Sequence, residues 1–299
     1  MTRFLTFSLP VFFLFFEKTA AQSGSFPTGS AATEIIDRLQ ILTGNPDILQ
    51  TEIRPFLRKN AVQLAMAFDS TDHQFLLPAE IRDIHYLYDD DNEYLAAIDL
   101  PNILVGKNQR QTVQIDQQNI LATPPYASKF SILRKVQQKP LLKYFYKTPA
   151  NLFEVNAKYF RLRANPVLNF EFGKATNDGD NYLFFNRRGI EVRGDIDDRV
   201  FFSTDILETQ AGLPGFADLR FSHEQTLPGA NLVKPYNSRV LDILKGYDFG
   251  QSETRIGFQA THHIGIEFGR ATHFIGNGYR SLLLSDFAAP YLFLKINTK

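Results

Sequence analysis

The stretch from residue 253 to residue 268 constrains the fold most, because apolar and polar side chains alternate in it with a period of two. The apolar members hold even-numbered positions: Ile256, Phe258, Ala260, Ile264, Ile266 and Phe268. The polar members hold odd-numbered positions, with His262 as a polar exception on the apolar side: Arg255, Gln259, Thr261, His263 and Glu267. Such alternation predicts a β-strand with one apolar and one polar face. The length favours a tilted membrane-spanning strand of roughly 10 residues with an extension; a long strand of a soluble β-sandwich is the alternative.

Further strand candidates follow residue 145, separated by residues that favour turns. The clearest strand patterns lie at 182–193, 199–210 and 292–298. Sequences that suit tight reversals lie at 177–181, 195–198 and 276–278, and Gly- and Pro-rich stretches that suit longer loops lie at 212–229 and 235–250. With 28 Phe and 12 Tyr in the chain, this pattern is typical of antiparallel transmembrane β-barrels, in which lipid-facing and lumen-facing residues alternate. We therefore expect residues 145–299 to form outer-membrane β-barrel strands, about seven or eight of them.

The first 21 residues have the pattern of a secretory signal peptide. Arg3 supplies the positive charge, Phe4–Phe16 is apolar, and Thr19–Ala21 places small residues before Gln22. The apolar run is shorter than the roughly 20 residues that a membrane-spanning helix needs, and Pro10 interrupts it. We expect export, with cleavage after residue 21.

Composition excludes several classes of protein. The chain has no cysteine, so a disulfide framework, a thioether-linked lipid and any cysteine-based metal site are excluded. Thirty-two Lys and Arg balance 32 Asp and Glu, which gives no support to nucleic-acid binding. After residue 21 no apolar stretch is long enough for a helical membrane span.

Residues 33–98 are expected to form a small α-helical module. Helical spacing of apolar residues begins after Thr33 and ends at Gly44 and Pro46, and further helices are expected at 58–68 and 78–87. The Gly- and Ser-rich residues 22–32 are expected to be a flexible linker. Residues 99–144, with several prolines, are expected to be an extended connector.

No motif in the chain predicts catalysis. Ser281 and Ser285 do not lie in the G-x-S-x-G pattern of a hydrolase nucleophile. His262 and His263 are adjacent, so on a strand they would point to opposite faces and could not bind one metal ion together. The acidic runs lack the ligand spacing of a calcium loop. We expect no catalytic residue, no metal site and no cofactor.

Residues 268–294 resemble the signature of the Wzi-type capsule-assembly family of outer-membrane proteins. The signature has Gly-Arg at a strand end, a Gly-x-Gly turn, Ser-Leu-x-Leu-Ser, and a Pro before the next strand. In this chain its positions are Gly269, Arg270, Gly276, Gly278, Ser281, Leu282, Leu284, Ser285 and Pro290. Residues 36–39 and 53–58 are similar to the family's periplasmic helical segment, and residues 140–149 to the barrel entry of Bacteroidetes-type members, including members linked to gliding motility.

The resemblance implies a β-barrel with a periplasmic helical module, located in the cell outer membrane. It implies lectin-like retention or assembly of surface polysaccharide rather than catalysis, with outer-membrane lipid, polysaccharide and other envelope proteins as partners. Tyr236, Asn237 and Arg239 are our candidates for glycan contact on a loop. The alternative function is an adhesion or gliding-motility component of the envelope.

Family barrels use considerably more chain than the residues after 145 provide. The last strand candidate, 292–298, has no predicted partner to close a barrel, and an unpaired strand edge in lipid costs several kcal/mol for each unpaired group. We therefore expect the barrel to be incomplete and the chain to be truncated at its C-terminal side; a complete eight-stranded barrel, the smallest known closure, is the alternative.

Overall fold

The structure is a computed structural model that describes residues 23–44, 49, 51–70, 77–95, 150–175, 182–197, 199–238, 244–261, 263–276, 278 and 280–298. The predicted signal (1–21), the predicted connector (99–144), the turn expected at 177–181, and residues His262 and Arg239 lie outside this set. The described residues form mainly antiparallel β-sheet with a few helices, as predicted. None of the helices in this part of the chain is long and apolar enough to cross a membrane.

The N-terminal part is a helical module, which we define as residues 23–95. Its helices are α1 (Ala31–Thr43), α2 (Arg58–Ser70), α3 (Pro78–Asp90) and the short α4 (Asn92–Leu95). The three longer helices lie where the sequence predicts them. Gly44 ends α1 with φ of 63°, a conformation that glycine adopts without strain. The helices share a core whose fully buried members include Ile36, Leu39, Val62, Leu64 and Leu87.

The segment before α1 differs from the flexible linker expected at 22–32. Phe26 is 1% exposed and belongs to the core of the helical module. Its backbone N–H donates to the carbonyl of Phe56 at 3.0 Å, and Ser25 forms a β-bridge with Leu57. The Gly and Ser content of the stretch suggested flexibility, but one aromatic anchor and these backbone bonds fix it.

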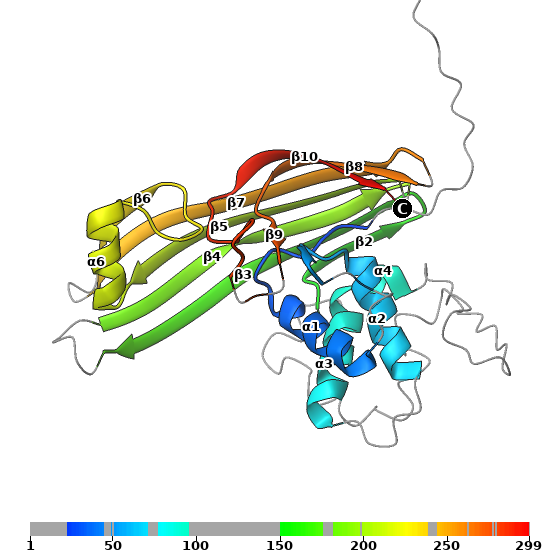
Figure 1. Cartoon of the computed structure of the whole chain (residues 1–299), viewed down its shortest axis with the longest axis horizontal. Helices are drawn as coiled ribbons and strands as arrows, with labels where there is room; N and C mark the ends of the chain where they lie inside the picture. Colours follow the sequence, from blue (N-terminus) through cyan, green and yellow to red (C-terminus); the bar gives the residue numbers. More distant parts are fainter. Residues whose placement is uncertain are drawn as a thin grey trace, which may run out of the picture.

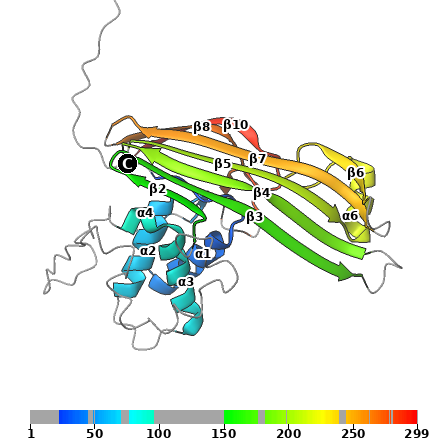
Figure 2. The same cartoon turned by 180° about the vertical axis from the view of Figure 1, so that it is seen from behind.

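The C-terminal part is one large antiparallel sheet. Its strands are β2 (Phe153–Ala157), β3 (Phe160–Lys174), β4 (Tyr182–Ile196), β5 (Val200–Gly212), β6 (Val233–Asn237), β7 (Lys245–Gln259), β8 (Ile264–Ala271) and β10 (Tyr291–Thr298). Their order is β10-β8-β7-β5-β4-β3-β2, with β6 beside the first half of β7. β3, β4 and β7 have 15 residues each, well above the usual strand of about 5–6. Figures 1 and 2 show these long strands running side by side, with the helical module against one face of the sheet.

The two-residue strands β1 (Ile53–Arg54) and β9 (Phe274–Ile275) pair with each other outside this sheet. β9 belongs to the connection between β8 and β10, so this connection reaches across to the helical module. α6 (Gly215–Glu224) follows β5 and lies at the end of the sheet farther from the module (Figure 1). We call that end the far end, and the end with the turn between β4 and β5 the near end.

Two predictions about the strands are wrong. Residues 253–268 are not one long strand, because the chain reverses at 260–263 between β7 and β8. There the Thr261 hydroxyl accepts hydrogen bonds from the backbone N–H groups of His263 and Ile264. Gln259 pairs with Gly265, so parity is preserved across the turn and the even-numbered residues of both strands share a face. Residues 235–250, expected to be a loop, belong largely to β6 and β7.

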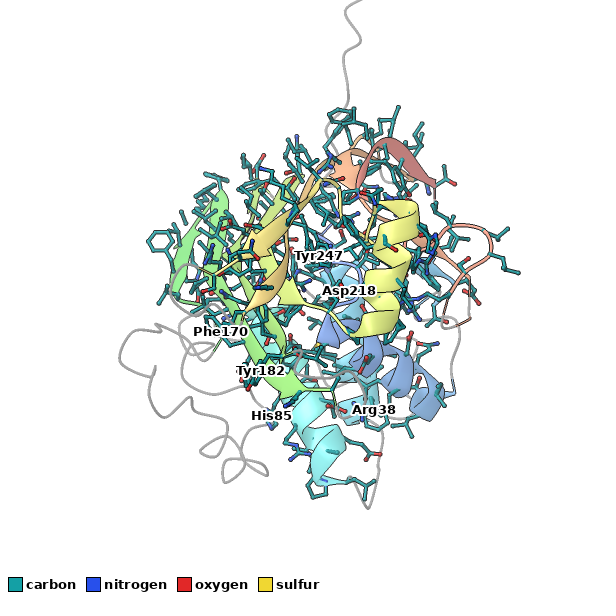
Figure 3. All side chains as sticks on the ribbon, turned by 90° about the vertical axis from the view of Figure 1, so that its left-hand side faces the viewer. Arg38, His85, Phe170, Tyr182, Asp218 and Tyr247 are labelled. Carbon is teal, nitrogen blue, oxygen red and sulfur yellow. The ribbon has the colours of Figure 1, made fainter. Side chains whose placement is uncertain are left out.

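The sheet has two chemically different faces. Through the pairing register, the even-numbered residues of β3, β4, β5, β7, β8 and β10 lie on one face, which we call the outer face. The odd-numbered residues of these strands form the inner face, which contacts the helical module and α6. Asp218 of α6 and Tyr247 of β7 lie toward one another on the inner side (Figure 3) and are hydrogen bonded. The helices therefore cover the polar side of the sheet.

Two isoleucines of α1 test the packing of the helical module. Ile36 is 0% exposed in its core, whereas Ile41 is 80% exposed one turn later. We expect Ile36→Ala to lower the free energy of unfolding by about 2–5 kcal/mol, since it leaves a cavity, and Ile41→Ala by less than about 0.5 kcal/mol. Urea unfolding followed by circular dichroism measures both. Equal losses for the two variants would contradict this packing.

Candidate functional site

Charged side chains hold the helical module against the inner face. Arg58 of α2 contacts Glu191 of β4 at 3.0 Å, and Arg193 of β4 contacts Glu93 of α4 at 3.2 Å. Arg163 of β3 donates to the side-chain oxygen of Asn92 at 3.1 Å. The three arginine side chains are each no more than 4% exposed. A buried charge without a partner is costly, so these contacts fix where the module sits.

The same contacts control the ionisation of the α3 C-terminus. Arg58 donates to Asp90 at 2.8 Å and to Asp91 at 2.7 Å, and Arg193 also contacts Asp90. Burial alone would raise the pKa of Asp90, but the guanidinium groups of Arg193 and Arg58 lower it to about 2. Asp90 therefore stays ionised at neutral pH and keeps its pairing across the interface.

A cavity of about 430 Å³ lies on the inner face beside the helical module. Four separate parts of the chain line it: the segment before α1, the inner residues of β3, β4, β5 and β7, the turn at 228–229, and the connection before β10. The side chains on which its chemistry depends are Arg187, Glu191, Asp205, Gln251, Glu253, Arg280, Asp286 and Phe287. Its volume falls within the range of about 300–1,000 Å³ typical of small-molecule sites.

Three carboxylates form a row across one wall of this cavity. Glu191 on β4, Asp205 on β5 and Glu253 on β7 are direct cross-strand neighbours. The two outer members have cationic partners: Glu191 has Arg58 and Arg193, and Glu253 accepts from Arg255 at 3.0 Å. Within the described residues, the central Asp205 has no hydrogen-bond or ion-pair partner.

The other side chains of the cavity are mostly planar polar groups held by local contacts. Arg187 donates to Gln251 at 3.2 Å, and Gln251 in turn donates to the carbonyl of Gly229 at 3.0 Å. Arg280 donates to both oxygens of Asp286, at 2.9 and 2.8 Å. The guanidinium of Arg280 also lies 5.9 Å from the ring centroid of Phe287. The cavity thus combines fixed polar groups with an aromatic ring.

The family-signature residues that begin the β8–β10 connection have structural roles. A Cβ at Gly269 would lie 2.1 Å from the carbonyl oxygen of Thr254, so only glycine allows this close strand contact. Arg270 donates to the backbone and side-chain oxygens of Ser252, at 2.8 and 2.9 Å. Gly276, with φ of 141°, donates from its N–H to the carbonyl of Glu52 in the helical module at 2.7 Å.

The later signature residues shape the connection that walls the cavity. Ser281 donates to the carbonyl of Ile275 and accepts from the N–H groups of Leu283 and Leu284, which folds the segment back. Leu284 bridges Ile275, Ser285 bonds to Asp286, and Pro290 lines the cavity. Leu282 is fully exposed, and Gly278 lies in the bend before Ser281.

The structure does not bring the candidate glycan residues together. Tyr236 lies on the outer face, where its ring is 6.0 Å from that of Phe184. Asn237, next along β6, points to the opposite face, and Arg239 lies outside the described residues. These residues were chosen because the composition around them suggested a loop, whereas Tyr236 and Asn237 belong to a strand.

The cavity residues carried no recognisable sequence signal. Asp205 and Gln251 occupy ordinary odd positions of strands, and only the folded arrangement joins them with Arg280 and Phe287, which lie near the C-terminus. Among the described residues, no group of three or more His, Asp or Glu side chains is placed to hold a metal ion. His263 lies exposed in the turn between β7 and β8.

Comparison with protein-family models, with curated proteins and with solved structures finds no match for this chain. A proposal about function therefore rests on the geometry of the sheet and of the cavity, and on the resemblance of residues 268–294.

Two arginines of β4 test the interface between module and sheet. We expect Arg193→Met to lower the free energy of unfolding by about 3–5 kcal/mol, because it leaves the buried Glu93 with only Arg163 at 3.8 Å and removes one of the two arginines that pair with Asp90. Arg188→Met is the matched control: Arg188 pairs with Glu208 on the outer face, where both are about half exposed, and we expect a loss below about 1 kcal/mol. Thermal unfolding by circular dichroism compares them, and similar losses would show that the buried contacts do not hold the module.

Proposed function

We propose that this chain is an exported, non-enzymatic outer-membrane protein that retains or assembles surface polysaccharide, with its long strands forming part of a transmembrane β-barrel wall. The observation that carries the proposal is the outer face of the sheet, which is apolar and exposed. Its large exposed members are Leu168, Phe170, Phe172, Ile190, Ile196, Ile206, Ile256, Phe258, Ile264, Phe268, Leu292, Leu294 and Ile296. A continuous apolar face of this extent indicates contact with another apolar phase, and lipid fits it because the opposite face is polar.

The boundary between apolar and charged residues on the outer face supports a membrane location. On β4 the first charged residue from the near end is Arg188, which pairs with Leu168 of β3. β3 itself remains apolar through Phe172 and becomes charged only at Lys174. On β8 the charge begins earlier, at Arg270. β7, which lies between β5 and β8, has no outer-face charge until Asp248, which pairs with Gln210, so the boundary is uneven. From the near end up to this boundary, the outer face of β3, β4, β5, β7 and β8 has no charged residue, as a lipid-facing surface requires.

Aromatic residues gather on the outer face near the far end. Phe172 and Tyr182 stack with ring centroids 5.7 Å apart, and Phe184 contacts Tyr236 at 6.0 Å. In outer-membrane barrels, belts of aromatic residues lie at the membrane–water interfaces. The position of Tyr236 suits such an aromatic belt better than it suits glycan contact on a loop.

The polysaccharide role rests on the resemblance of residues 268–294 to the Wzi-type family, and the inner face gives it a physical site. The β8–β10 connection, which carries this resemblance, folds back to form a wall of the polar cavity. Fixed guanidinium, amide and carboxylate groups beside an aromatic ring suit the recognition of hydroxyl-rich ligands. The cavity holds a hydroxyl beside a carboxylate, since Thr272 donates to Glu253 at 2.6 Å, but the resemblance implies retention of polysaccharide rather than catalysis, so we favour binding.

A pair of arginine substitutions on β5 tests the membrane location. Ile206 is 55% exposed within the apolar part of the outer face, whereas Gln210 is on the same face beyond the charged Glu208. We expect Ile206→Arg to destabilise the membrane-inserted state by about 2–4 kcal/mol and Gln210→Arg by at most about 1 kcal/mol. Outer-membrane fractionation and urea extraction of the two variants measure the difference. Recovery of the unaltered protein in the soluble periplasmic fraction would contradict the location.

A deletion strain tests the function. We expect cells without this protein to synthesise surface polysaccharide at the normal level but to release it into the medium. Quantifying cell-bound and released polysaccharide, with the gene restored as the control, measures the effect. Polysaccharide retained at the surface with gliding lost would instead support the motility alternative.

A further inference from the structure

We infer that the inner-face cavity is the glycan-contacting site and that it selects neutral or amine-bearing sugar units over uronic acids. The inference rests on the proposed function, and it adds a location and a charge preference. Its central element is Asp205, the carboxylate without a partner among the described residues.

The hydrogen-bonding capacity of the cavity determines what a ligand must provide. A ligand that brings hydrogen-bond donors or a positive charge would favour the ionised, acceptor-only form of Asp205, which lies between two other carboxylates. Sugar hydroxyl groups and a protonated amine both do so. Arg187 and Gln251 bond to each other, and Arg280 bonds to Asp286, so these groups are already oriented before a ligand arrives. The site therefore needs little reorganisation to bind a rigid ring.

The charges beside Asp205 set the preference. Glu191 and Glu253 flank Asp205 directly. Each of these two glutamates already forms an ion pair with arginine, which neutralises its charge. A carboxylate on the ligand would lie against this row of three carboxylates, while Arg187, the cation beside them, is already bonded to Gln251. An ammonium group would instead pair with the carboxylate that lacks a partner. Like charges at such a distance are unfavourable in a partly buried site, and opposite charges are favourable.

The shape of the cavity supports a ring-sized ligand rather than an ion. Its volume of about 430 Å³ is bordered by four parts of the chain and is open on one side, and Phe287 contributes an aromatic wall. Arg220 of α6 lies 4.7 Å from the centroid of that ring, which fixes its position from the side of the far end. The outer-face Tyr236 has no comparable enclosure among the residues that the structure describes, so the cavity replaces it as the contact site.

Binding of small probes to the purified full chain in detergent micelles tests the inference. Glucosamine, N-acetylglucosamine, glucuronic acid and putrescine differ in charge and in the presence of a sugar ring, and saturation-transfer NMR with calorimetry ranks them. We expect glucosamine to bind about tenfold or more tightly than glucuronic acid, with N-acetylglucosamine between them. Putrescine should bind more weakly than glucosamine because it has no ring hydroxyl groups.

Three variants locate the site. Asp205→Asn removes the charge at constant shape and should abolish the preference of glucosamine over N-acetylglucosamine. Leu207→Trp fills the cavity from the same strand and should abolish binding of all sugars. Glu208→Gln is the matched control on the outer face of β5, and it should bind as the unaltered protein does. Circular dichroism and protease resistance confirm that each variant is folded.

The possible results separate this inference from the proposed function. Preference for glucuronic acid, putrescine binding as strong as glucosamine, or unchanged binding by Asp205→Asn would overturn the cavity assignment. Loss of sugar binding in Tyr236→Ala alone would move the site to the outer face. If no probe binds while the protein fractionates with the outer membrane, the inference fails and the membrane location stands. If glucosamine binds as expected but the protein is not in the envelope, the proposed function fails instead.

Discussion

The buried arginines between the helical module and the inner face are the contacts on which the arrangement of this protein depends. Arg58, Arg163 and Arg193 are almost fully removed from water, so each must have anionic or polar partners from the facing element. Their partners come from α3 and its C-cap, α4, β2 and β4, and the pairs between helix and strand define one position of the module on the sheet. The cavity depends on that position, because strands form its floor and the segment before α1 closes one of its sides. Apolar packing alone would hold the module together without specifying where it docks.

Residue parity was the part of this architecture that the sequence made predictable. Even-numbered residues of six strands share one face, and the alternation at 253–268 predicts the apolar face for two of these strands, β7 and β8. The same pattern gave no sign of the reversal at 260–263. The turn keeps the even-numbered residues on the same face, so the alternation continues through it as it would in one strand. The error at 235–250 has a related cause, because Pro235 and the glycines of β7 suggested a loop although β6 and β7 pair through these residues. In the helical module, helix spacing and Gly44 located the helices well, whereas the fixed segment at 23–30 depends on the burial of Phe26, which composition does not reveal.

The cavity could not be derived from the sequence for a different reason. Its residues come from positions as far apart as 27 and 290, and most are ordinary polar residues of strands. Asp205 is one of many odd-position acids, and its distinction is that its cross-strand neighbours on both sides are carboxylates that already have arginine partners. Arg280, Asp286, Phe287 and Pro290 lie in the stretch that the sequence analysis singled out for its resemblance to a family, but nothing there marked them as cavity residues. Gly269 and Gly276 are explained by close backbone contact and by a positive φ, so their motif describes a fold of the connection rather than a ligand.

The two faces of the sheet impose opposite requirements, and one sequence satisfies both. The inner face can hold Arg163, Arg193 and Arg255 only because helices and neighbouring carboxylates cover them. The outer face leaves large apolar side chains such as Phe170 and Leu294 more than 60% exposed, which water would penalise along the whole sheet. A soluble β-sandwich would bury the apolar face against a second sheet and solvate the polar one. Here the helices cover the polar face and leave the apolar face open, and the proposed contact with lipid would account for this arrangement.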